Sequence, residues 1–283
     1  MKFIIIYYKI NKHTNKHTNK HTNKHTNKMN IGTHIPKSKS FYLSLKKFFD
    51  IEKNKDRPVQ FFTGSPKFWK RPKITKEEVE RTKKYIIKNN LWVFVHSIYL
   101  INLSQPEEKF NEKAFGCLKW EMQAGLLCGF KGVVVHTGKS LKMPINDALD
   151  NMFNNICNIL KHTSPTCPLL LETSSGQGSE TLWNYEDFSK FYKRFTETQQ
   201  ERIKICIDTC HIFAAGHDPF KFIKDWDKEF PESLILVHFN DSKEKCGEKK
   251  DRHACPGCGH IGSKKLKLVE DWCKNKNIPM VLE

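Results

Sequence analysis

Apolar residues recur along most of the chain in two alternating patterns. Runs of five or six residues rich in Val, Ile, Leu and Phe are typical of buried strands. Longer segments with apolar positions three or four residues apart are typical of helices. The predicted strands are 31–35, 59–63, 91–96, 132–136, 168–172, 203–208, 234–239 and 279–283. The predicted helices are 41–49, 76–88, 112–127, one capped by Asp147, 185–198, 219–230 and 264–274.

The order of these elements predicts the fold class. Eight strands that are apolar on both faces and alternate with helices are typical of a parallel α/β barrel, the (β/α)₈ or TIM barrel. The pattern lacks the eighth helix, because the chain stops after the last predicted strand. A doubly wound open sheet is the alternative, but no Gly-rich phosphate-binding turn follows the first strand.

The first residues differ from the rest in composition. Residues 11–26 are four copies of Asn-Lys-His-Thr. Such a repeat has no apolar face, so we expect 1–28 to be a disordered tail. The TIM-barrel domain is then predicted to span 29–283, a length that suits one domain.

Charge and cysteine usage narrow the class of protein. The chain has 48 basic and 31 acidic residues, and its net charge is +17. Seven of the Lys lie in residues 1–30, which hold no acid, so the rest carries +10, as expected of a protein that meets nucleic-acid phosphates. Ten Cys without a disulfide framework or signal peptide predict a reducing intracellular compartment: cytoplasm, nucleus, or a virion if the source is viral. The apolar run 3–8 is too short to span a membrane.

Six of the eight predicted strands end on a metal-ligand type of residue. These residues are separated by 40, 36, 36, 30 and 45 positions, each close to one strand–helix unit. Since all strand ends of a parallel barrel face the same side, the six side chains should converge. Their charges would be unpaired there unless cations bind. The six are His96, His136, Glu172, Asp208, His238 and Glu283.

Three further candidates lie in the loops that follow these strands, namely His211, Asp251 and His253. Nine nitrogen and oxygen ligands are too many for one tetrahedral ion and suit a cluster of two or three. Small residues and a Gly follow His211 and suit a tight loop. Cys210 and the pair Cys255 and Cys258 lie near the same side, but one Cys-x-x-Cys supplies only half of a zinc site.

Several segments resemble those of the endonuclease IV family of apurinic/apyrimidinic (AP) endonucleases. They are LLLETSSGQGSE (169–180), CIDTCHIFAAGHD (206–218), VHFNDSK (237–243), and DRH with GHIG (251–262). HSIYLINL (96–103), VVVHTGKSL (133–141) and the opening IGTHI are also similar to family segments. The resemblance runs from Met29 to Glu283 and implies a TIM barrel with three zinc ions.

The resemblance also assigns the ligands. One zinc is expected on His96, His136 and Glu172, a second on Glu172, Asp208, His238 and Glu283, and a third on His211, Asp251 and His253. Glu172 would bridge the pair that activates water, and Glu283 would orient that water, so both are expected to be catalytic. The family inserts a Tyr-Leu pair into DNA at the lesion, here Tyr99 and Leu100. Lys67 stands where the family has an Arg, which puts stacking at this position in doubt, since Lys is a point charge without a planar face.

The sequence therefore predicts a zinc-dependent DNA repair endonuclease that cuts double-stranded DNA 5′ to abasic sites. The products would be a 3′-hydroxyl and a 5′-deoxyribose phosphate. We expect a monomer with no membrane association. One alternative is a metal-dependent sugar isomerase of the same barrel type, which the basic charge and nine ligands disfavour. Another is an inactive DNA-binding remnant of the nuclease.

Overall fold

The computed structural model describes residues 31–283. The predicted tail, 1–28, lies outside the described residues.

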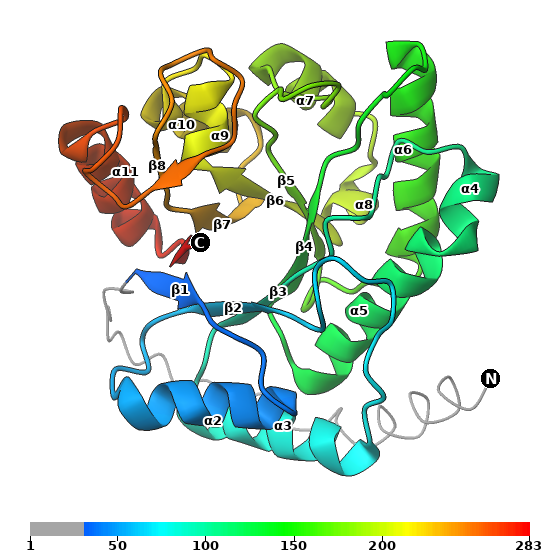
Figure 1. Ribbon diagram of the computed structural model, residues 1–283, viewed down its shortest axis with the longest axis vertical. Coiled ribbons are helices and arrows are strands. Elements are labelled where there is room, and N and C mark those ends of the chain that lie inside the picture. The colour runs from blue at the N-terminus through cyan, green and yellow to red at the C-terminus, as the bar shows by residue number, and fades with distance from the viewer. Residues whose placement is uncertain (1–30) are drawn as a thin grey trace.

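Eight parallel strands form one closed barrel (Figure 1). The strand order around it is β1-β10-β7-β6-β5-β4-β3-β2, which confirms the predicted fold. Closure depends on β10, which pairs with β7 on one side and with β1 on the other. No helix follows β10 in the sequence, and the barrel closes without one. The strands are β1 (Gly32–His34), β2 (Val59–Phe62), β3 (Val93–His96), β4 (Gly132–His136), β5 (Leu169–Glu172), β6 (Ile203–Asp208), β7 (Leu234–His238) and β10 (Met280–Leu282).

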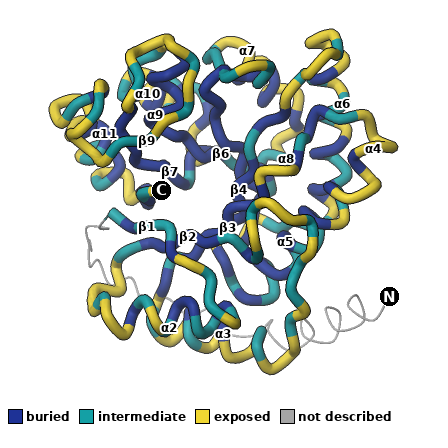
Figure 2. The backbone as a smooth tube through the Cα atoms, in the orientation of Figure 1, coloured by how far each residue is buried: buried dark blue, intermediate teal, exposed yellow. Residues whose placement is uncertain are grey.

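The strands are apolar on both faces because both faces are covered. Six strand side chains fill the barrel interior, and a larger cluster packs between the strands and the helices. Figure 2 shows the strands as the buried centre of the molecule. The inner six are Phe94, Val134, Leu170, Cys206, Leu236 and Val281. Gly32 is required where β1 meets β2, because a Cβ there would lie 1.8 Å from the Pro58 carbonyl oxygen.

Helices surround the barrel (Figure 1). In chain order they are α2 (Phe41–Ile51), α3 (Lys76–Asn89), α4 (Glu107–Glu112), α5 (Ala114–Cys128), α6 (Ile145–Leu160), α7 (Tyr185–Tyr192), α8 (Glu197–Gln200), α9 (Thr209–Ala214), α10 (Pro219–Glu229) and α11 (Ser263–Lys276). A short antiparallel hairpin of β8 (Asp241–Ser242) and β9 (His253–Ala254) lies outside the barrel.

The helix predicted over 112–127 is α5, whereas α4, which ends at Glu112 and is separated from α5 at Lys113, was not predicted. Three predictions about helices were wrong. The segment 185–198 is α7 and α8, because Thr196 and Gln199 form a capping box that starts a new helix. Asp147 does not cap α6, which begins after Pro144, and lies in its first turn. The segment after His211, predicted as a tight loop, begins inside the helix α9, which extends to Ala214.

Candidate metal centre

All nine predicted ligands lie together at the carboxyl ends of the strands. Ligand atoms that lie within 4.8 Å of one another define four overlapping groups. Two of them share Glu172 and are here called the paired groups; the other two share His253, one with Asp208 and His211 and one with Cys210 and Asp251. Because Asp251 lies close to both His211 and His253, these three residues, with Asp208 at their edge, are called the hairpin group. The paired groups are His96, His136 and Glu172, and Glu172, Asp208, His238 and Glu283.

Glu172 lies at the centre of the paired groups because its two carboxylate oxygens face opposite sets of imidazoles. Oε2 is 3.1 Å from Nε2 of His96 and 3.1 Å from Nε2 of His136. Oε1 is 2.9 Å from Nδ1 of His238. The same His238 nitrogen is 3.1 Å from Oε2 of Glu283 and 3.8 Å from Oδ2 of Asp208. A carboxylate in this position is suited to bridge two cations.

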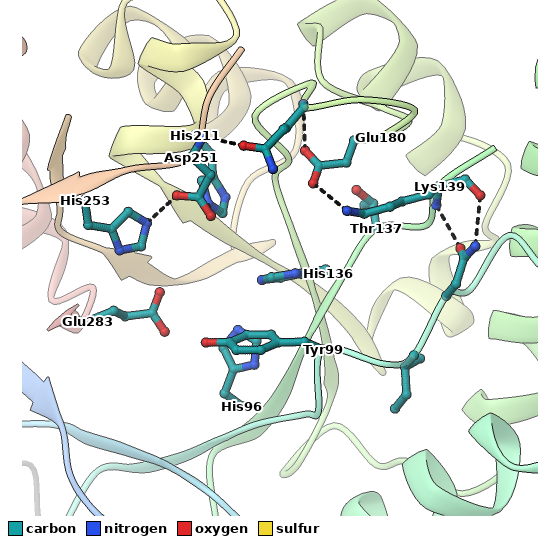
Figure 3. Close-up of a pocket in the computed structure, with 13 residues that line it drawn as sticks. His96, Tyr99, His136, Thr137, Lys139, Glu180, His211, Asp251, His253 and Glu283 are labelled. Atoms are coloured by element: carbon teal, nitrogen blue, oxygen red, sulfur yellow. Dashed lines mark hydrogen bonds and ion pairs between the residues drawn. The ribbon is translucent and has the colours of Figure 1, made fainter. Parts of the chain in front are cut away.

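The hairpin group is assembled by a helix and a hairpin rather than by strand ends. Asp208 caps α9, and its Oδ1 accepts the backbone N–H of His211 at 2.9 Å, which places His211 one turn above the strand. Nε2 of His211 lies 3.3 Å from Oδ2 of Asp251. Nε2 of His253, on β9, lies 3.0 Å from Oδ1 of Asp251 and 3.6 Å from Oδ2 of Asp208. Figure 3 shows Asp251 between these two imidazoles.

Hydrogen bonds on the far side of the imidazoles fix which nitrogen is free. Nδ1 of His96 is 2.7 Å from the Ser97 carbonyl oxygen, and Nδ1 of His211 is 2.8 Å from the Thr173 carbonyl oxygen. A carbonyl oxygen can only accept, so each Nδ1 carries a proton and the opposite Nε2 faces the carboxylates. Metal-binding imidazoles are held in this way, with the remaining N–H donated to an oxygen.

Gln60 holds His238 and Glu283 and was missed by the sequence analysis. Its Nε2 donates to Oε1 of Glu283 at 2.7 Å, and its Oε1 is 3.0 Å from Nε2 of His238. Nδ1 of His238 therefore faces the carboxylates. Asn240 similarly donates to Oδ2 of Asp208 at 2.7 Å. No sequence pattern could have found Gln60, because it lies 223 positions from Glu283 and acts only across the closed barrel.

The opposite charges in the centre shift one another's pKa values. Burial alone would raise the pKa of Glu172, but His136 and His238 outweigh it and hold that pKa well below its usual range. Burial alone would lower the pKa of His211, but Asp208 and Asp251 raise it well above the ordinary value. In the metal-free centre the pKa of Glu172 is thus lowered and that of His211 raised by opposite charges nearby.

The donor set fits zinc ions. Bound zinc would supply the positive charge that protons on the imidazoles supply when metal is absent. Five imidazoles and four carboxylates are the ligand types of zinc. Nε2 of His211 and Nε2 of His253 are buried without a hydrogen-bond partner, although both lie near Asp251. Both nitrogens point toward the same carboxylate but form no hydrogen bond with it. This is the arrangement expected of ligands that surround an ion.

A pocket of about 270 Å³ opens onto the centre (Figure 3). Tyr99 forms part of its wall, and its ring stacks 5.6 Å from the ring of His136. Tyr99 and Leu100 are both exposed, at 54% and 40%. Lys67 is exposed on the loop after β2, next to Pro66, whose carbonyl oxygen accepts the Tyr99 N–H at 3.2 Å. The three predicted DNA contacts thus lie on two adjoining loops beside the pocket.

The cysteines contribute little to this centre. Cys255 and Cys258 are exposed, and within residues 31–283 neither belongs to a group of three or more possible ligands. Cys210 is buried and lies within 4.8 Å of ligand atoms of Asp251 and His253. No helix in the described part of the chain is both long and apolar enough to cross a membrane.

Comparisons with known proteins agree with this geometry. The sequence matches the family described as Xylose isomerase-like TIM barrel over residues 57–268. A putative endonuclease 4 from Acanthamoeba polyphaga mimivirus is 35% identical over 268 residues, which cover 89% of this chain and 84% of that protein. A probable endonuclease 4 from Halothermothrix orenii is 32% identical over 270 residues, which cover 90% of this chain and 93% of that protein.

Solved structures give the same result. The crystal structure of endonuclease IV from Thermus thermophilus superposes with a TM-score of 0.75 at 25% identity, and the match covers 89% of this chain and 91% of that one. A D-tagatose 3-epimerase-like protein shares the fold, with a TM-score of 0.66 at 16% identity over 89% of this chain and 90% of that one. Sequence and structure together show that the chain belongs to the endonuclease IV family of AP endonucleases, a metal-dependent family of nucleases built on a TIM barrel.

Proposed function

We propose that this protein is a zinc-dependent endonuclease of base excision repair that hydrolyses the phosphodiester 5′ to an abasic site in double-stranded DNA. The products are a 3′-hydroxyl and a 5′-deoxyribose phosphate. The observation that carries the proposal is Glu172, whose two oxygens face two separate sets of imidazoles in a fully buried position. Together with the family membership, this favours a multinuclear hydrolytic site.

Three zinc ions are proposed per chain, on ligands that the structure brings together. The paired groups would hold two, with Glu172 shared, and the hairpin group would hold the third. Bound zinc lowers the pKa of water to about 7 and neutralises charge on phosphoryl oxygens.

The protein's own residues supply position and shape. Gln60 fixes the carboxylate of Glu283 at the edge of the pocket, where we propose that it orients the attacking water. The imidazoles keep one direction because Ser97 and Thr173 hold their outer nitrogens. Tyr99 and Leu100, exposed beside the pocket, are placed to enter DNA at the lesion, and Lys67 to meet phosphate.

The phosphate backbone is the other half of the proposed recognition. The net charge of +17 is spread over a chain in which Lys and Arg outnumber Asp and Glu by 48 to 31. A basic protein attracts DNA without sequence preference, and this attraction weakens with salt. We further propose that the protein acts as a monomer inside the cell, where its ten free cysteines stay reduced.

A metal-dependent sugar isomerase is the second candidate, because epimerase-like proteins share the barrel. That likeness, at 16% identity, extends to the fold alone. An isomerase would hold one or two ions and act on a small molecule, so its substrate binding would not depend on salt. An inactive remnant would hold little or no metal.

Zinc content and incision on matched duplexes separate these candidates. We expect about three zinc ions per chain, incision of an abasic duplex, no incision of the undamaged duplex, and DNA affinity that falls steeply from about 50 to about 200 mM salt. One or two ions with salt-independent substrate binding would indicate the isomerase. Little or no metal with retained DNA binding would indicate the remnant.

A further inference from the structure

Large hydrophobic side chains are exposed on the two adjoining loops beside the pocket, and one of them has no role in the proposed function. Residues 31–283 contain eight exposed large hydrophobic side chains, three of which lie on the loops after β2 and β3. Two are Tyr99 and Leu100. The other is Phe68, which is 67% exposed. Exposed aromatic surface that gathers in one place marks a binding surface.

A buried ion pair between Arg71 and Glu121 holds the loop that bears Phe68. Nη1 of Arg71 lies 3.0 Å from Oε1 of Glu121 and 2.9 Å from Oγ1 of Thr63. The Arg71 side chain is 6% exposed and Glu121 is fully buried. Removing two charges from water is unfavourable, so such a pair is weak evidence for stability and calls for another reason.

The hydrogen bonds of Nη2 of Arg71 show that the Arg71–Glu121 pair positions the backbone of the loop that bears Phe68. Nη2 of Arg71 donates to the carbonyl oxygen of Ser65 at 3.1 Å and also to the carbonyl oxygen of Phe68. The planar fork therefore connects the fixed carboxylate of Glu121 to the backbone at both sides of Lys67. Lys could not reach these acceptors in the same way, because it lacks the rigid fork. The backbone of Phe68 is thus fixed while its ring remains in solvent.

The two loops also join each other. The Tyr99 N–H donates to the Pro66 carbonyl oxygen at 3.2 Å, and the rings of Phe62 and Tyr99 meet edge to face at 5.2 Å. Phe68 therefore lies on the loop that contacts the Tyr99 loop, and its neighbours in the sequence Lys67 and Lys70 are exposed as well. Positive charge next to an exposed ring matches a nucleic acid, whose phosphates and base faces lie side by side.

We propose that Phe68 stacks on a base next to the abasic gap, and that Arg71 and Glu121 position it for this contact. An abasic site leaves the neighbouring bases without a stacking partner, and an aromatic ring can cover the bare face. Phe68 supplies the planar surface that Lys67 lacks. Phe68 is a specificity-determining residue, and Arg71 is a positioning residue that acts through it. The inference rests on the proposed function and identifies the base next to the gap as the part of the lesion that Phe68 recognises.

The test compares Phe68→Ala and Phe68→Trp with Ile87→Ala. Ile87 lies on α3 and has the same exposed fraction, 67%, so its variant controls for loss of an exposed apolar side chain. Binding of the full-length, zinc-loaded protein is measured on two duplexes, one undamaged and one with an abasic analogue. In the second duplex the 3′ oxygen of the nucleotide immediately 5′ to the analogue is replaced by methylene, so that the scissile bond cannot be cut.

We expect Phe68→Ala to weaken binding of the abasic duplex by about 10-fold with little change on the undamaged duplex. Phe68→Trp should restore the abasic preference, and Ile87→Ala should leave it unchanged. Arg71→Lys should reduce the preference less, and most of its effect should disappear in the Phe68→Ala background, because neighbours that act together are not additive.

The outcomes are distinguishable. If the wild-type protein neither prefers nor incises the abasic duplex, the proposed function fails and this inference fails with it. If the wild type behaves as proposed but Phe68→Ala matches Ile87→Ala, only the Phe68 assignment is overturned. Equal loss of affinity on both duplexes also overturns it, because a general DNA contact does not read the gap.

Discussion

The paired groups and the hairpin group use the same residue types but are held in place differently. The ligands of the paired groups stand on strands of the barrel or directly after one, and the side chains of His96, Glu172 and His136 are 2%, 0% and 35% exposed. In the hairpin group, the side chains of Asp251 and His253 are 36% and 25% exposed. Strand ligands inherit the fixed spacing of the barrel, whereas Asp251 and His253 depend on a hairpin with two residues in each strand.

Other contacts compensate for the short hairpin. The buried carboxylate of Asp241 accepts the backbone N–H groups of Gly257, Gly259 and Ile261 at 2.9 to 3.0 Å. Gln177 accepts the backbone N–H of Asp251 at 3.1 Å. The hairpin group is therefore fixed by side-chain contacts at its edges. It should bind its ion more weakly and exchange it more readily than the paired groups.

Glu172→Gln should have the largest effect, because it acts on both paired groups at once. The change removes a central negative charge and replaces one carboxylate oxygen with an amide donor that cannot face a cation. We expect lower zinc content, near-normal binding of abasic DNA, and incision slower by at least about 10³. The third ion should largely remain. Zinc content, DNA binding and single-turnover incision measure these effects.

Glu180→Gln is the matched control, since Glu180 lies at the same pocket but outside the three groups and forms hydrogen bonds with Ser175 and Gln177. It should keep its zinc and most of its activity. Near-wild-type incision by Glu172→Gln would refute the bridging role and, with it, the assignment of three zinc ions.

Asp251→Asn should have a smaller effect that is confined to the hairpin group. His211 and His253 would lose the carboxylate between them, so the third ion should dissociate while the paired groups keep theirs. We expect zinc content to fall by about one ion and incision to slow on the order of 10². A titration with chelator should likewise remove this ion first in the wild type. Loss of all zinc from Asp251→Asn would show that the groups do not bind independently.

The difference between ligands on barrel strands and ligands on a short helix and hairpin also explains which ligands the sequence could predict. Ligands of the paired groups stand where apolar runs end, so one rule about parallel strands located all of them. The ligands of the hairpin group were located only as candidates in the loops after the strands, and the family resemblance was needed to place them together on one ion. Asp208 both caps α9 and lies among the other ligands, and a six-residue helix leaves no periodic pattern to detect. The break before α8 did have a signal, the capping box Thr196 to Gln199.

Residues that act across the closed barrel had no signal at all. Gln60 looks like one polar residue in an apolar strand until β10 closes the barrel and brings Glu283 to it. Barrel closure also brings Nδ1 of His34, at the end of β1, to 3.8 Å from Oε1 of Glu283. Such contacts follow from strand order around the barrel, which local patterns do not encode.

The stability of the metal-free protein should depend on pH in a way that metal removes. His211 and His238 have raised pKa values, so they stabilise the fold fully below the unfolded value of about 6.5, and this is lost as pH rises through the folded values. Glu172 and Glu283 have lowered pKa values, so their contribution is present above about 4.5 and lost at lower pH. The Tm of chelator-treated protein should therefore fall from about pH 6 to about pH 9, and the gain on adding zinc should increase. A metal-free Tm that stays level or rises over this range would contradict the charge assignment.

Removal of residues 1–28 should have the smallest effect and sharpens the zinc counts above. The repeat contains four His, which could bind zinc loosely and so add to the ions counted for the two kinds of group. It lacks the apolar side chains that could pack against the barrel. A chain that starts at Met29 should keep its Tm, its incision rate and about three zinc ions, with any excess zinc of the full-length protein gone. If the shortened chain instead fails to fold, or loses an ion from the paired groups, then the repeat or its flanking residues belong to the folded structure, and the predicted domain boundary is wrong.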